Sequence, residues 1–350
     1  MTYGPAWRLV VTIAITSGAA TFTGAQHSRF PQRFDEYLKN HVRLTDAERT
    51  SLAAGAPVTK LLDADPATEV AVFGAVWVAA PPSLYVRAVT DIETFERGAS
   101  FRVTKKISEP ARFEDFAALE LPEDDFEDLK TCRPGDCELK VSRESLDRLR
   151  KEVNWSKPSA RADAERLFRQ IALDYVNAYR EGGNARLAIY RDAARPTFVA
   201  AEFESLVNRM PELTSYLPDL RRYLLGYPKY SLPASTSFLY WQEAAFGLKP
   251  TIRINHVVIA EGTEGITVAS KQLYASHYFW TALELRVLVP DPSRSQGFWF
   301  ATINRSRSDG LGGFVGRMIR GRVRGEATSG MQAVLKVTKT NLEQQAKREH

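Results

Sequence analysis

The chain has 350 residues, of which 44% are hydrophobic and 25% are charged, and its formal net charge is +5. This composition is sufficient for a full hydrophobic core and argues against a wholly disordered chain. The mild positive charge is mostly matched by nearby acids, so it gives no support to nucleic-acid binding.

The first 25 residues have the pattern of a secretory signal peptide. Arg8 is the only charged side chain in residues 1–25, and residues 9–20 are apolar or small. Residues 23–25 are small, as cleavage by a signal peptidase requires. The apolar run is too short for the about 20 residues that span a membrane. We therefore expect a secreted or periplasmic protein with one elaborated domain over residues 26–350.

The region up to residue 225 predicts mostly helices. Thr45 and Glu48 have the spacing of a capping box, which restarts a helix within the first helical stretch. Residues 70–79 predict a central strand because both faces are apolar. The other expected strands cover residues 101–107 and 187–190, and the expected helices cover residues 26–55, 82–93, 142–154, 160–181, 198–207 and, in pieces, 210–225.

An acidic run covers residues 110–128 and is rich in carboxylates, among them Asp115, Asp125 and Asp128. Clustered carboxylates can bind calcium, but this run lacks the ligand spacing and the turn glycine of a calcium loop. The run therefore favours a solvated helix face.

The chain has two cysteines, Cys132 and Cys137, separated by Arg-Pro-Gly-Asp. These four residues favour a tight turn that brings the two thiols together. An exported protein meets an oxidising compartment, so we expect a structural disulfide. A redox pair or half of a metal site is the alternative, but the spacing is wrong for the first and no second cysteine pair completes the second.

The stretch from residue 251 to residue 342 predicts several antiparallel strands and one long closing helix. The expected strands cover residues 251–259, 266–279, 280–289 and 298–304, and a helical pattern follows the glycine-rich residues 310–316. The fold class is therefore α+β, with an antiparallel sheet closed by a long C-terminal helix and a largely helical insertion. Such a sheet and helix can enclose an apolar pocket for a small ligand.

This order of elements resembles the helix-grip fold of START and polyketide-cyclase-like proteins, which implies an apolar ligand pocket. Short phrases also resemble a family of uncharacterised exported bacterial proteins. The phrases are CRPGDC, YLLGYP, FLYW, FGLKPTIRINHV, ASKQLYASHYF and NRSRSDGLGGF. That family carries no established activity, so the resemblance implies no catalytic residues.

Two histidines are weak candidates for acid–base catalysis. His256 shares a strand face with Ile252 and Ile254, and His277 lies on the next expected strand. Nearby tyrosines Tyr274 and Tyr278 could assist one of them. The two histidines could instead bind a metal, although the sequence specifies no third ligand. A hydrogen-bonded sheet histidine without a catalytic role is the other alternative. The sequence contains no nucleophile elbow, zinc-protease motif or phosphate loop, so we expect neither a metal nor a cofactor.

Residues 269–279 alternate between two faces, and one face carries hydroxyl, amide and aromatic groups. Gln272, Tyr274 and Ser276 on this face could orient the polar end of a ligand, or they could form a solvent-facing ladder. Arg305 and Arg307, before the closing helix, are further candidates for ligand binding. We expect an exported protein that binds an apolar, lipid-like molecule. The alternatives are an enzyme that uses a sheet histidine, and an envelope protein that docks on an anionic membrane surface through its basic helix.

Gly321 and Gly325 are unusual in the closing helix because each costs about 1 kcal/mol relative to alanine. They lie four residues apart and so share one face of the helix. We expect close packing of this face against a neighbouring element to offset the cost.

Overall fold

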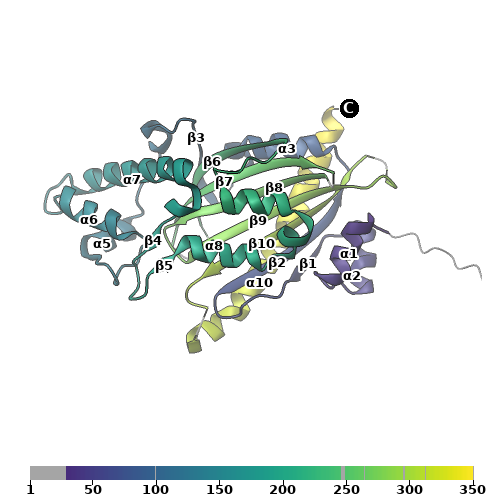
Figure 1. Cartoon of the computed structure of the whole chain (residues 1–350), viewed down its shortest axis with the longest axis horizontal. Helices are drawn as coiled ribbons and strands as arrows, with labels where there is room; N and C mark the ends of the chain where they lie inside the picture. The colour runs from purple at the N-terminus through teal and green to yellow at the C-terminus, as the bar shows by residue number, and fades with distance from the viewer. Residues whose placement is uncertain are drawn as a thin grey trace, which may run out of the picture.

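The computed structural model describes residues 29–98, 100–245, 249–263, 265–294, 296–311 and 313–349, so the expected signal peptide lies outside the described residues. The fold is α+β, as expected. It is built on an eight-stranded antiparallel sheet with the order β1-β2-β10-β9-β8-β7-β6-β3 and with helices on both faces (Figure 1). The expected disulfide between Cys132 and Cys137 is present.

The strands are β1 (Val58–Leu61), β2 (Glu69–Val78), β3 (Phe101–Ile107), β4 (Ile189–Tyr190), β5 (Thr197–Phe198), β6 (Ser235–Ala244), β7 (Thr251–Gly262), β8 (Gly265–Ala275), β9 (Phe279–Pro290) and β10 (Phe298–Ser308). The helices are α1 (Gln32–Asn40), α2 (Asp46–Ala53), α3 (Pro82–Thr90), α4 (Ile92–Phe95), α5 (Glu123–Thr131), α6 (Arg143–Glu152), α7 (Ala160–Gly182), α8 (Val199–Asn208), α9 (Pro218–Gly226) and α10 (Gly313–Glu349). Short helical turns are η1 (Phe113–Phe116), η2 (Gly183–Arg186) and η3 (Glu212–Tyr216).

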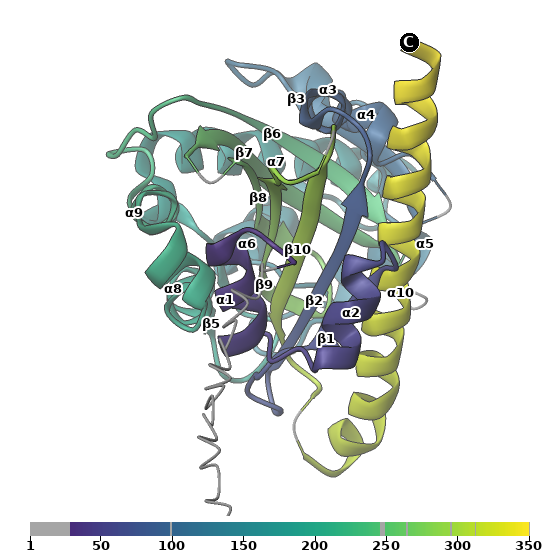
Figure 2. The same ribbon diagram turned by 90° about the vertical axis from the view of Figure 1, so that its right-hand side faces the viewer.

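The long C-terminal helix α10 closes one face of the sheet along β2 and β1, and its C-terminal end lies beside α3 (Figure 2). Met331 and Leu335 of α10 are buried against Gly74 of β2. A Cβ atom on Gly74 would lie 2.8 Å from Cγ of Met331 and 2.9 Å from Cδ1 of Leu335. Because Gly74 has no side chain, α10 can approach the sheet closely here. The side chains of Met331 and Leu335 fill the seam between α10 and β2.

The prediction that Gly321 and Gly325 pack closely against a neighbouring element is wrong. No heavy atom of a neighbouring part of the described chain lies within 4 Å of a Cβ built on either glycine. The spacing of the glycines shows that they share a face, but it carries no information about what that face meets. The close approach occurs instead ten residues further on, where Leu335 meets Gly74 of β2.

These two environments predict opposite effects of adding a side chain. Gly325→Ala is expected to raise the free energy of unfolding by several tenths to about 1 kcal/mol, because alanine is the better helix former and the space is open. Gly74→Val is expected to lower it by about 1–3 kcal/mol through overpacking against Met331 and Leu335. Urea unfolding of both variants measures the difference. A Gly325→Ala protein that is less stable than the wild type would contradict this description of α10.

The opposite face of the sheet is covered by α1, α7, α8 and α9 (Figure 1). The helical stretch expected over residues 26–55 restarts as predicted: it forms two helices, and the chain turns between them at Arg43, which has φ 58°. The second helix does begin with the expected capping box of Thr45 and Glu48. Phe203 of α8 and Tyr179 of α7 are fully buried on this face.

The acidic run is only partly the solvated surface that its composition predicts. It forms η1 and the beginning of α5, but Asp125 of α5 is fully buried. Composition cannot distinguish this carboxylate from its neighbours, because its partner is a histidine far along the chain, described below.

The C-terminal end of α7 makes a close contact with the turn after α9. Gly183 has φ +57°, and a Cβ there would lie 1.7 Å from the carbonyl oxygen of Tyr227. Only glycine fits this position. The contact seats Tyr227 against the end of α7 and above the strands β7 and β8, where the buried polar residues described next are found.

Candidate functional site

The two candidate histidines are both buried, but they belong to separate hydrogen-bond networks. His277 lies just after β8. Its Nε2 is 2.9 Å from Oδ1 of Asp125, and its Nδ1 is 3.2 Å from the carbonyl oxygen of Glu138. The carbonyl can only accept, so Nδ1 carries a proton, and Nε2 is occupied by the carboxyl group. Both ring nitrogens are therefore engaged, one with Asp125 of α5 and the other with the backbone at Glu138.

A β-bulge separates two residues that were expected on one face. The pairing of β7 with β8 shifts between Ile254 and Asn255, so that Leu273 is the extra residue. Gln272 accepts a hydrogen bond from Nε of Arg253 on the face that carries α10, at 3.0 Å. Tyr274 instead contacts the rings of Tyr175 and Tyr190 on the opposite face. The expected polar face is thus divided between the two sides of the sheet.

The remaining candidates of this stretch hold local structure. Oγ of Ser276 accepts a hydrogen bond from the backbone N–H of Ile252 at 3.0 Å, and Ser276 is fully buried. The hydroxyl of Tyr278 accepts one from the N–H of Lys249 at 2.8 Å. Neither hydroxyl lies near His256.

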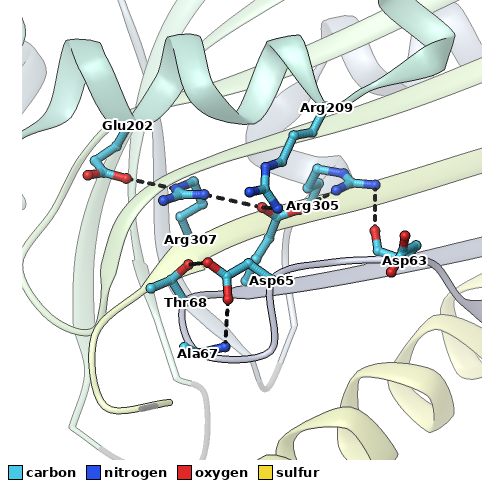
Figure 3. Close-up of polar contacts among 9 residues, drawn as sticks. Asp63, Asp65, Ala67, Thr68, Glu202, Arg209, Arg305 and Arg307 are labelled. Carbon is cyan, nitrogen blue, oxygen red and sulfur yellow. Dashed lines mark hydrogen bonds and ion pairs between the residues drawn. The ribbon is translucent and has the colours of Figure 1, made fainter.

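Arg305 and Arg307 lie at the end of β10 and share a buried carboxylate, that of Glu69 on β2. Nη1 of Arg305 pairs with Oε1 of Glu69, and Nη1 of Arg307 lies 3.3 Å from its Oε2. Nε of Arg307 also donates to Oε2 of Glu202 on α8 at 2.7 Å, and Arg305 reaches the carbonyl oxygen of Asp63 (Figure 3). We call Glu69, Glu202, Arg305 and Arg307 the arginine clamp.

The arginine clamp joins β2, β10 and α8, and its four charges compensate one another. Arg209, at the end of α8, adds a half-exposed guanidinium 4.0 Å from Oε2 of Glu69. Asp65 faces this group from the loop before β2, where it accepts a hydrogen bond from the N–H of Ala67 (Figure 3). The pKa of Asp65 is held below its ordinary value by that hydrogen bond, with help from the Thr68 hydroxyl and from Arg209 and Arg307. Because the charges compensate one another, the structure favours a structural role for Arg305 and Arg307, which the sequence analysis considered as ligand-binding residues.

His256 belongs to a second buried cluster, which centres on Lys271 of β8. Its Nδ1 lies 2.9 Å from the hydroxyl of Tyr179, which lies 3.4 Å from Nζ of Lys271. Nζ also donates to Oδ1 of Asn184 and lies 4.2 Å from the ring centroid of Phe203. Among the described residues, no carboxylate forms an ion pair with this fully buried amine.

The cluster was not predicted, although the sequence contains a signal for it. Lys271 occupies an inward position of a strand, on the face that also carries Leu273. A lysine among apolar neighbours on one strand face indicates either an edge position or a buried amine. Its partners Tyr179 and Asn184 come from α7 and η2, and no local pattern connects those residues with β8.

Burial changes the ionisation of the cluster strongly. Desolvation lowers the pKa of Lys271 to about 7. Desolvation, helped by the positive charges of Lys271 and Arg180, lowers the pKa of His256 to about 3. Desolvation raises the pKa of Tyr179 well above its ordinary value. At neutral pH, His256 is thus a neutral imidazole with one donor and one acceptor nitrogen, and Lys271 titrates in the physiological range.

An open groove of about 980 Å³ lies at the edge of the sheet, beside the first residues of β6. Strand β3 ends at Ile107, opposite Leu239. In the described part of the chain, no strand pairs with the outer side of residues 235–238. We call this the edge groove, and its lining includes Val86, Lys106, Arg180, Ser237, Phe238 and Ile259.

The edge groove lies next to the Lys271 cluster, and Arg180 belongs to the surroundings of both. Ser237 lines the groove and lies near the side chain of Tyr223 on α9. The hydroxyl of Tyr223 lies 3.4 Å from Nε2 of His256. Arg180 of α7 also lines the groove and lowers the pKa of His256. The groove and the buried cluster are therefore two parts of one candidate site.

Comparison with known proteins gives no further guide to this site. No family model, no curated protein and no solved structure matches the chain. Within the described residues, no group of three or more histidine, cysteine or acidic side chains is placed to hold a metal ion. None of the described helices is long and apolar enough to cross a membrane.

Proposed function

We propose that this protein is an exported binding protein that holds an amphipathic, lipid-like molecule in the edge groove. The signal-peptide pattern of residues 1–25 supports export, and the disulfide between Cys132 and Cys137 is consistent with an oxidising compartment. The single observation that carries the binding proposal is the mixed chemistry of the groove lining.

One part of the groove lining is apolar. Val86 of α3, Phe238 of β6 and Ile259 of β7 come from three elements, and Phe238 and Val86 are partly exposed. Such a surface gains free energy when a hydrocarbon covers it, at roughly 25 cal/mol per Å². A hydrocarbon chain or ring system is the part of a ligand that fits here.

The other part of the lining is polar. Nζ of Lys106 lies 4.4 Å from the ring centroid of Phe238 and 3.3 Å from the carbonyl oxygen of Thr90. Arg180 donates from Nη2 to the carbonyl oxygen of Ser108 at 2.8 Å. Thr236 and Ser237 are exposed hydroxyls on the unpaired edge of β6. These groups can bind the polar head of the same ligand.

The edge groove is not the place where the sequence predicted the ligand. That location was between the sheet and the closing helix. Met331 and Leu335 occupy the seam above Gly74, and α10 lies directly on β2 there. A ligand in this seam would have to displace buried side chains, whereas the edge groove is already open.

Titration with the fluorescent lipid probe N-phenyl-1-naphthylamine tests this function. We expect saturable binding that Phe238→Asp weakens at least tenfold, because a carboxylate replaces the apolar wall of the groove. Val337→Asp, on the exposed side of α10, is the matched control and should bind like the wild type. Equal binding by both variants would contradict the proposal.

A further inference from the structure

The first residues of β6 carry backbone groups that no neighbouring strand covers. Successive residues of an antiparallel strand point their N–H and C=O groups alternately to the strand on one side and to the strand on the other. Ala234 points toward β7, because its carbonyl oxygen accepts a hydrogen bond from the N–H of Glu261 at 3.0 Å. Ser235 and Ser237 therefore point their backbone groups to the opposite side, which β3 does not reach because it ends at Ile107.

The pairing of β3 with β6 agrees with this alternation. Ile107, the last residue of β3, lies opposite Leu239. The N–H of the preceding Lys106 turns away from β6 and donates to Oε1 of Glu93 at 3.1 Å. Leu239 therefore points its backbone groups toward β3, and Ser237, two residues earlier, points in the same direction beyond the end of that strand. In the described part of the chain, no strand lies opposite this outer edge of β6.

The edge groove runs along this unpaired backbone. Its lining includes residues 235–238, and its volume of about 980 Å³ is sufficient for a short extended peptide with a hydrocarbon chain. The apolar wall of the groove, formed by Val86, Phe238 and Ile259, borders the same edge, because Phe238 belongs to β6 and Ile259 lies opposite Thr236. One molecule can therefore contact the apolar wall and the strand edge together.

Charged side chains of both signs line the groove, namely Lys106, Arg180, Glu109, Asp115 and Glu261. Both cations donate to backbone carbonyl oxygens, and Asp115 accepts from the N–H groups of Ser108 and Arg112. Because the lining has no net positive charge, it does not favour the carboxylate of a fatty acid or a phosphate. The uncharged edge of β6 instead matches a head group of uncharged amides, each of which has one donor and one acceptor.

We propose that the ligand of the edge groove is an acylated peptide, whose short extended backbone pairs with Ser235 and Ser237 and whose acyl chain covers Phe238 and Ile259. This inference rests on the proposed function and names the class of its ligand. Alternate residues of an extended peptide have the same spacing as the two serines, so the N–H and C=O groups of both find partners. A simple fatty acid pairs with fewer of these groups, because its head has no repeating amide.

Displacement of N-phenyl-1-naphthylamine by matched lipids tests the head group. N-dodecanoyl-trialanine amide is compared with the same compound methylated at its amide nitrogens, and with dodecanoate. The methylated compound keeps the acyl chain and the absence of charge, but it cannot donate hydrogen bonds. We expect the unmodified peptide to displace the probe at concentrations about tenfold lower than either of the other two, because several hydrogen bonds to β6 are lost with them.

Ser237→Pro removes one outward N–H group from β6, and proline is tolerated at a sheet edge. This variant should bind the probe like the wild type but show a smaller preference for the unmodified peptide over the methylated one. Ser237→Ala keeps the N–H group and is the matched control, which should retain the full preference. Equal displacement by the two peptides in the wild type would overturn the proposal, as would an undiminished preference in Ser237→Pro.

Hydrogen exchange of the backbone amides, followed by NMR, gives a second measurement that needs no variant. With the unmodified peptide bound, the N–H groups of Ser235 and Ser237 should exchange more slowly, whereas that of Thr236, which points toward β7, should be unchanged. Unchanged exchange at both serines under saturating peptide would overturn the proposal. These failures would leave probe binding by the wild type intact, whereas a wild type that does not bind the probe would contradict the proposed function and this inference with it.

Discussion

Glu69→Gln is expected to lower the free energy of unfolding by about 3–5 kcal/mol, because it leaves buried guanidinium groups without their carboxylate. Glu69 is 1% exposed, and Arg305 and Arg307 both pair with it. The amide can still accept one hydrogen bond, but it cannot balance two charges. Urea unfolding at neutral pH measures the loss.

Glu202→Gln is the matched control for that change. Glu202 accepts from the same Arg307, but its side chain is 25% exposed, so water can replace its charge. Its expected cost is about 1 kcal/mol or less. Equal losses in the two variants would contradict the structural role assigned to the arginine clamp, as would a Glu69→Gln protein as stable as the wild type.

Lys271→Met is expected to flatten the dependence of stability on pH above neutrality. The pKa of Lys271 is about 7 in the folded protein, and the ordinary pKa of a lysine, which the unfolded chain restores, is 10.5. Between these values the unfolded chain holds a proton that the folded protein lacks, so the free energy of unfolding rises with pH in this window. Below pH 7 both states are protonated and the cost of the buried charge is constant. The full difference corresponds to about 5 kcal/mol as an upper limit.

The measurement is urea unfolding of wild type and Lys271→Met at intervals from pH 6 to 9.5. The wild type should gain stability over the variant as pH rises, and the variant should be the more stable protein at pH 6. Parallel profiles would show that Lys271 keeps its proton when folded.

Much of the fold follows from local patterns. The helix expected at residues 160–181 is α7, and the double proline at Pro81 and Pro82 begins α3. The strands after residue 250 and the long closing helix were also predicted, because alternation and helical spacing persist over many residues there. The turn chemistry between Cys132 and Cys137 likewise predicted the disulfide correctly.

Less of the candidate site could be predicted from the sequence, because the residues that contact one another there lie far apart along the chain. His256 was identified, but Tyr179 and Tyr223 come from separate helices. The bulge at Leu273 moves Tyr274 to the other face, and a strict period of two cannot foresee a bulge. The edge groove exists because β3 pairs with only part of β6, a register that neither strand shows alone.

The most direct test of the binding function is native mass spectrometry of the mature protein, purified from its own envelope fraction or from an exporting host under mild conditions. We predict a population heavier than the apoprotein, from which activation releases an amphipathic molecule. Phe238→Asp, purified in parallel, should lack this population, and Val337→Asp should retain it. Apoprotein alone in the wild-type spectrum, or a bound molecule unaffected by Phe238→Asp, would contradict binding in the edge groove.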